Sequence, residues 1–132
     1  MKFPIPASLL QQKVFQCNDD GESKAKFHAD GKKFLKALAA EIGVTGKCDI
    51  RSNLGGGAVL GEVTLHSDSV YIQLFEFGQP GVRIMYRSCE GRKDYSGGTN
   101  MYVDLKDLKN NPEVLDRFIA VCTRMVNAGI AA

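Results

Sequence analysis

The sequence predicts one α+β domain: an antiparallel meander sheet of four to five strands, with an N-terminal and a C-terminal amphipathic helix packed on one face. The chain has one helical apolar stripe near its start and another near its end. Between them lie short segments in which apolar and polar residues alternate, which is typical of strands with one buried face. The links between these segments are short, which favours antiparallel neighbours. A length of 132 residues fits a single domain.

The beginning of the chain is expected to form an arm with a short helix over residues 1–22, followed by the domain at 23–132. A polar, turn-rich stretch at 18–23 separates the two. The first long helix is predicted over 24–42, with Ser23 as its cap and Gly43 at its end. Its apolar stripe consists of Phe27, Phe34, Leu35, Leu38 and Ile42.

The central segments are predicted as strands over 48–52, 59–66, 70–77 and 82–89, with a fifth short strand over 100–103. If both helices cover one face of the sheet, the opposite face is open to solvent. That face would carry Leu60, Glu62, Thr64, His66, Tyr71, Gln73, Phe75, Arg83, Met85 and Arg87. Such a mixture of aromatic, polar and cationic groups suits a binding surface better than a second core.

The end of the chain is predicted to be helical. Asp104 is expected to cap a short turn over 105–109, and Asn111 to cap the last helix, with Pro112 at its first position. Gly129 is expected to end this helix. Its apolar stripe consists of Leu115, Phe118, Ile119, Cys122 and Val126.

Composition excludes several classes. The net charge of +2 is too small to indicate nucleic-acid binding by itself. The four cysteines contain no C-x-x-C pair, so no zinc ribbon is expected. Cys48, Cys89 and Cys122 fall in apolar patterns and are interpreted as buried free thiols; disulfides stay open if the protein is exported. No secretory signal, membrane span, metal site or cofactor site is expected, which favours a cytoplasmic protein.

The loop at 87–100 is the part of the sequence that looks least like scaffold, since it gathers cations, a tyrosine and glycines. Its cations would contact phosphate or carboxylate, its tyrosine would stack on a base or ring, and its glycines would let an anion approach. Arg83 would extend the patch onto the sheet. The predicted site residues are Arg83, Arg87, Arg92, Lys93, Tyr95, Gly97 and Gly98. The alternatives are a solvated hairpin loop and a contact with a protein partner.

Other motifs give weaker evidence of function. The glycines at 55–57 lead into a strand rather than a helix, so they are interpreted as a turn and not a phosphate loop. A Cys89–His66 pair could act as nucleophile and base if the two strands are adjacent. Four lysines opposite the first apolar stripe, Lys26, Lys32, Lys33 and Lys36, are typical of a solvated face.

Three blocks, 48–53, 61–66 and 92–95, resemble small accessory proteins of phages and other mobile elements. The resemblance implies a protein that binds or blocks host machinery, and it assigns no role to any residue. From the basic loop and the exposed sheet face, we expect a non-enzymatic module, monomeric or homodimeric, that docks a nucleic acid or a nucleoprotein. The alternative is an inhibitor or adaptor of a host protein, for example anti-restriction or anti-CRISPR-like, anchored by Phe75, Met85 and Tyr95. An enzyme using Cys89 and His66 is the third hypothesis.

Overall fold

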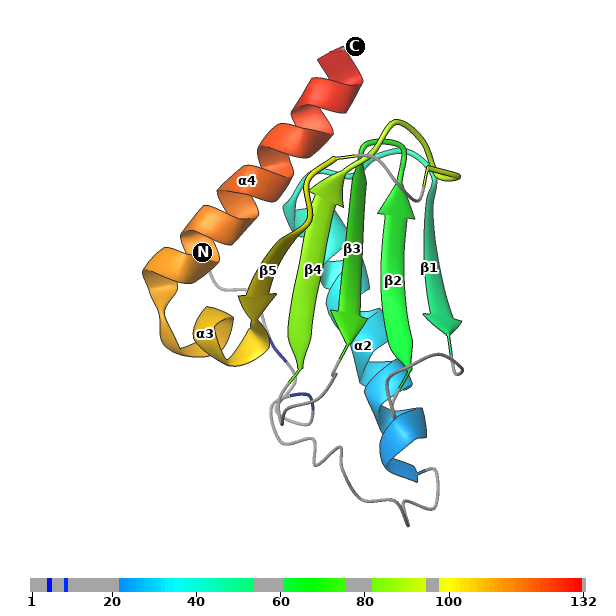
Figure 1. Cartoon of the computed structure of the whole chain (residues 1–132), viewed down its shortest axis with the longest axis vertical. Helices are drawn as coiled ribbons and strands as arrows, with labels where there is room; N and C mark the ends of the chain where they lie inside the picture. Colours follow the sequence, from blue (N-terminus) through cyan, green and yellow to red (C-terminus); the bar gives the residue numbers. More distant parts are fainter. Residues whose placement is uncertain are drawn as a thin grey trace.

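The protein is an α+β fold with one open antiparallel sheet, as predicted. The computed structural model describes residues 5, 9, 22–53, 61–75, 82–94 and 98–131. Helix α2 (Glu22–Glu41) precedes the sheet, and α3 (Leu105–Asn110) and α4 (Pro112–Ala131) follow it. The strands are β1 (Cys48–Asn53), β2 (Glu62–Ser67), β3 (Val70–Phe75), β4 (Arg83–Ser88) and β5 (Met101–Asp104), and they pair in chain order. Figure 1 shows α2 behind the sheet and α4 beside it.

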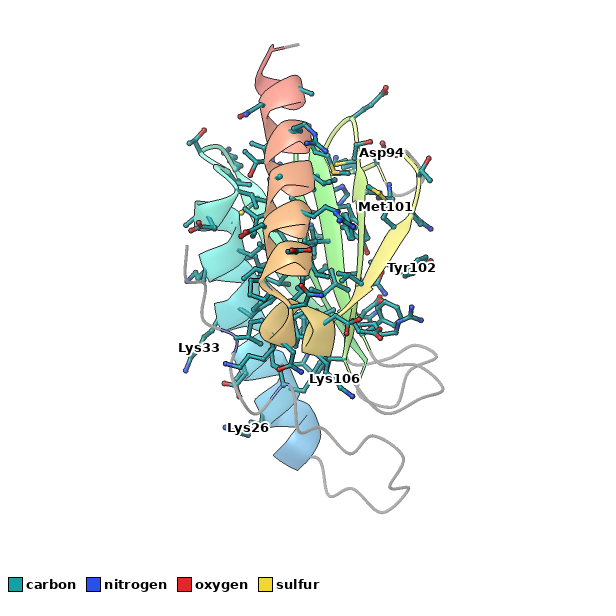
Figure 2. All side chains as sticks on the ribbon, turned by 90° about the vertical axis from the view of Figure 1, so that its left-hand side faces the viewer. Lys26, Lys33, Asp94, Met101, Tyr102 and Lys106 are labelled. Carbon is teal, nitrogen blue, oxygen red and sulfur yellow. The ribbon has the colours of Figure 1, made fainter. Side chains whose placement is uncertain are left out.

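The core lies between the sheet and the helices. On the inner face, Val63, Leu74 and Ile84 lie on adjacent strands in register and have no exposed surface. Figure 2, turned by a quarter from the first view, shows α2 and α4 on the same side of the sheet. On the opposite side, no described helix covers the sheet. The predicted division of the strand residues into two faces is therefore confirmed for β2, β3 and β4; Leu60 lies outside the described residues.

Helix α2 packs its predicted stripe into this core, and all five stripe residues are buried. It ends as predicted: Gly43 has a φ of +88°, and the Val44 N–H donates to the carbonyl of Ala39 at 2.9 Å. Its start differs, because the helix begins at Glu22, so Ser23 lies inside it and cannot be its cap. Gly31 is buried where the helix meets the sheet, and a Cβ there would lie 3.1 Å from Cγ2 of Val63.

The C-terminal helices follow the predicted order with two corrections. Asn111 caps α4, since its Oδ1 accepts from the N–H groups of Glu113 at 3.1 Å and Val114 at 3.4 Å. Asp104 precedes α3 but makes no side-chain cap, because its carboxylate pairs with Arg83. The predicted end at Gly129 is wrong, since α4 continues to Ala131. In α4, Phe118, Cys122 and Val126 are buried, and Leu115 and Ile119 are half-buried against the core.

Two described positions of the arm belong to the same core. Leu9 has no exposed surface and Ile5 packs partly buried against the cluster. At these positions the arm is therefore part of the domain's packing. Among the described residues, no helix combines the length and apolarity that a membrane crossing requires.

Candidate functional site

The candidate site is the sheet face that no described helix covers, called here the outer face. Cross-strand register arranges its side chains in three rows. The upper row is Asp49, His66, Tyr71 and Arg87; the middle row is Arg51, Thr64, Gln73, Met85 and Tyr102; the lower row is Asn53, Glu62, Phe75, Arg83 and Asp104. The rows differ in exposure, so they differ in what they can contact.

The upper row is mostly buried rather than open to solvent. Arg87 and His66 are each only 3% exposed, although both carry polar groups. The Arg87 guanidinium carbon lies 4.6 Å from the centre of the Tyr71 ring, and the His66 ring meets Tyr71 edge-on at 4.9 Å. Arg87 therefore contacts an aromatic ring of its own sheet, and its predicted contact with an external anion stays a prediction that this burial weighs against.

Burial sets the charge state of His66. Desolvation lowers the pKa of His66 below its usual value, and the nearby Arg87 charge acts in the same direction. Hydrogen bonds to the backbone of Gly91 and Asp94, and the Asp49 charge, act in the opposite direction. The histidine is therefore held neutral beneath the loop that follows β4.

Arg92 fastens the first half of that loop to the sheet. Its Nη1 lies 3.4 Å from Oδ1 of Asp49 on β1, and its Nε lies 3.6 Å from Oδ1 of Asp68 in the β2–β3 turn. Within the loop, the Glu90 N–H donates to Oδ2 of Asp94 at 3.0 Å. These contacts occupy the Arg92 guanidinium with carboxylates of the same chain. Its role as a phosphate contact stays a prediction, and an external phosphate would have to compete with two internal partners.

The other predicted site residues are dispersed. Lys93 is exposed on the loop, and Arg83 lies on the lower row, where its Nε donates to Oδ1 of Asp104 at 2.9 Å. Gly98 has a φ of +75°, and a Cβ there would lie 2.5 Å from the Ser88 carbonyl oxygen. The close approach that this glycine allows is thus to its own backbone. Tyr95 and Gly97 lie outside the described residues.

The Cys89–His66 hypothesis stays a prediction, and the environment of Cys89 weighs against it. Burial raises the pKa of the Cys89 thiol, whereas a nucleophilic cysteine needs a lowered one. Its Sγ contacts the Ser67 carbonyl at 3.4 Å. Cys48, Cys89 and Cys122 are free thiols, and burial raises the pKa of Cys122 to about 12. In the described ranges, no three His, Cys, Asp or Glu side chains cluster as metal ligands would.

The lower and middle rows carry an aromatic–cation cluster on β3, β4 and β5. Tyr102 is 52% exposed, and its ring meets Phe75 edge-on with centroids 6.4 Å apart. The Arg83 guanidinium carbon lies 5.6 Å from the Tyr102 ring centre, and the buried Met85 is the cross-strand neighbour of Tyr102. We call Phe75, Arg83, Met85 and Tyr102 the aromatic patch. Figure 2 shows Tyr102 directed away from both long helices.

Phe75, Arg83 and Met85 are among the outer-face residues predicted from the sequence, and Tyr102 is not. The signal was present, because Tyr102 alternates with the inward Val103 in the predicted fifth strand.

Charges on the outer face cancel. The strands carry the cations Arg51, Arg83 and Arg87 on this face, against the anions Asp49, Glu62 and Asp104. In the described part of the loop, Arg92 and Lys93 stand against Glu90 and Asp94. A recess of about 610 Å³ beside this loop is lined by Lys93 together with the acids Glu90 and Asp94. The described part of this surface therefore has no excess of positive charge, which weighs against docking of a polyanion.

Comparison with known proteins adds no identity: no family model, no curated protein and no solved structure matches the chain. The resemblance to accessory proteins of mobile elements accordingly stays a prediction.

Proposed function

We propose that the protein is a binding module that docks another protein on its outer face, with the aromatic patch at the centre of the contact. The observation that carries the proposal is the arrangement of Tyr102, which stands exposed on the uncovered face while Phe75 and Arg83 contact its ring. Tyr, Phe, Met and Arg are the residue types enriched in the centre of protein interfaces.

Two features favour a protein over a nucleic acid on this face. Its strand charges cancel, so it offers no net attraction to phosphates. The arginines of the predicted nucleic-acid site are engaged internally: Arg87 with Tyr71, Arg92 with Asp49 and Asp68, and Arg83 with Asp104. The partner expected here presents apolar or aromatic side chains to the patch and polar groups to the Arg83–Asp104 pair at its rim.

The patch stands on paired strands rather than on a loop, which lowers the cost of binding. Phe75 packs against the buried Tyr71, Met85 and Cys89 cluster. A contact surface that is already ordered loses little conformational entropy when it docks. A second copy of the chain is the competing occupant of the same face.

The test is affinity capture with the full chain, quantified against two single variants. Tyr102→Ala removes the exposed anchor, while Arg124→Ala removes an exposed side chain of α4 on the helix side. We expect a partner retained by wild type and Arg124→Ala and lost with Tyr102→Ala. With the purified partner, a loss of about 2 kcal/mol corresponds to a roughly 30-fold increase in Kd.

Three results contradict the proposal. The first is an identical set of captured proteins for wild type and Tyr102→Ala, and the second is no captured protein at all. The third is a dimer in light scattering that Tyr102→Ala dissociates, since the occupant would then be a second copy.

A further inference from the structure

Helix α2 presents a stripe of lysines on the opposite side of the molecule from the aromatic patch. Over 25–41, the part of the helix whose side chains are described, every exposed position is lysine or alanine: Ala25, Lys26, Ala29, Lys32, Lys33, Lys36 and Ala40. The two acids in this range, Asp30 and Glu41, are half-buried. Figure 2 shows Lys26 and Lys33 projecting from α2 away from the sheet, on the far side from Tyr102.

The other long helix shows that this pattern is not general to the protein. Over 112–128, the exposed positions of α4 include Glu113 and Asp116 beside Arg117 and Arg124, so its charges cancel. The outer face is likewise balanced. Among these three described surfaces, only α2 has an excess of positive charge, with four lysines against two half-buried acids.

We infer that the exposed stripe of α2 binds double-stranded nucleic acid through its phosphates, without reading the bases. Lysine is a compact point charge on a flexible stem, suited to phosphate and not to bidentate recognition of bases. From Lys26 to Lys36 the helix rises about 15 Å, the axial length over which one strand of a duplex places about four phosphates. The alanines between the lysines leave room for the polyanion to approach the helix.

The same stripe fits a single strand and a membrane less well. Binding of single strands relies on aromatic side chains that stack on bases, and the described exposed positions of α2 contain none. A helix that lies on a membrane inserts Trp, Phe or Leu between the headgroups, and among the described exposed positions of this stripe the only apolar residue is alanine. Lys26 pairs with Asp30 at 3.4 Å, but its side chain is 64% exposed, so this ion pair competes only weakly with a phosphate for the lysine.

This inference is independent of the proposed docking on the outer face. If both hold, the protein joins a protein partner on its sheet side to nucleic acid on its helix side. Tyr102→Ala should then bind duplex as wild type does, so that failure of one proposal is visible without failure of the other.

The test is fluorescence anisotropy of a short labelled DNA duplex with the full chain across a salt series. Four phosphate contacts predict a log–log salt slope of about −3.6, or roughly 100-fold weaker binding at about 200 mM than at about 50 mM salt. Lys32→Gln/Lys33→Gln should reduce the slope by about two. The control Arg117→Gln/Arg124→Gln removes the same charge from α4 and should leave the slope unchanged.

Each alternative result overturns the inference. No binding at about 50 mM salt removes the site. An equal effect of the two double variants would mean that total charge, and not the stripe, drives the binding. Binding to vesicles that contain phosphatidylserine, without binding to duplex, would assign the stripe to a membrane surface. Preference for a single strand over duplex would exclude the geometry proposed here.

Discussion

Gly98 offers the sharpest test of how the loop after β4 is held. Replacing it with alanine places a side chain on a residue with a φ of +75°, which costs about 1–2 kcal/mol for an L-residue. The new Cβ would also lie 2.5 Å from the Ser88 carbonyl oxygen and 3.1 Å from the Ser88 nitrogen. Because both are backbone atoms of Ser88, the last residue of β4, they cannot move aside as a flexible side chain would.

We therefore expect Gly98→Ala to lose at least about 2 kcal/mol of unfolding free energy, equivalent to a Tm lower by about 6–10 °C in a domain of this size. Urea unfolding followed by circular dichroism measures it. Gly91→Ala is the matched control, since no atom lies within 4 Å of a Cβ at Gly91 in the same loop. That variant should stay within about 0.5 kcal/mol of wild type. If Gly98→Ala is as stable as the control, the loop is not held against Ser88 as described.

Three further predictions concern other parts of the fold. Because burial lowers the pKa of His66, the unfolded chain binds a proton more readily than the folded one. The free energy of unfolding should therefore fall as pH drops below about 6.5, by at most about 1.4 kcal/mol per pH unit. His66→Gln should remove this contribution to the pH dependence between about pH 7.5 and 5.5, and an unchanged slope would refute it. Gly31→Val should cost about 1–3 kcal/mol in urea unfolding, since its Cβ would press on Val63, and a neutral result would show that α2 lies further from the sheet. Asn111→Ala should lose about 1 kcal/mol and Asn111→Asp almost none, because both Asn and Asp accept from the first N–H groups of α4; equal losses would contradict the cap.

The fold could be predicted because its information is local. Alternation in 48–52, 70–77 and 82–89 identified the strands and their faces, and short links implied the meander. Gly43 and Asn111 marked helix ends through chemistry that acts within a few residues. Two predictions of helix ends were wrong. Helix α4 continues past Gly129, and the carboxylate of Asp104 pairs with Arg83 instead of accepting from a backbone N–H of α3.

The site was harder to predict than the fold, because it depends on contacts between residues that lie far apart in the sequence. The segment from Arg87 to Arg92 looked like a free basic loop, yet Arg92 meets Asp49, which lies 43 residues away, and Arg87 is covered beside Tyr71. Sequence alone cannot show which cations are paired within the fold. The exposure of Tyr102 could have been predicted from the sequence, because the alternation in the fifth strand places it on the face opposite Val103.

The most direct test of the central claim, that the aromatic patch contacts a protein, is site-specific photocrosslinking. A photoreactive phenylalanine analogue would replace Tyr102, where an exposed aromatic ring already stands, and separately Ala120, an exposed position on α4. Illumination in a lysate of the source cells should give one discrete adduct from position 102 and none from position 120. No adduct at position 102, or the same adducts at both positions, would contradict the claim.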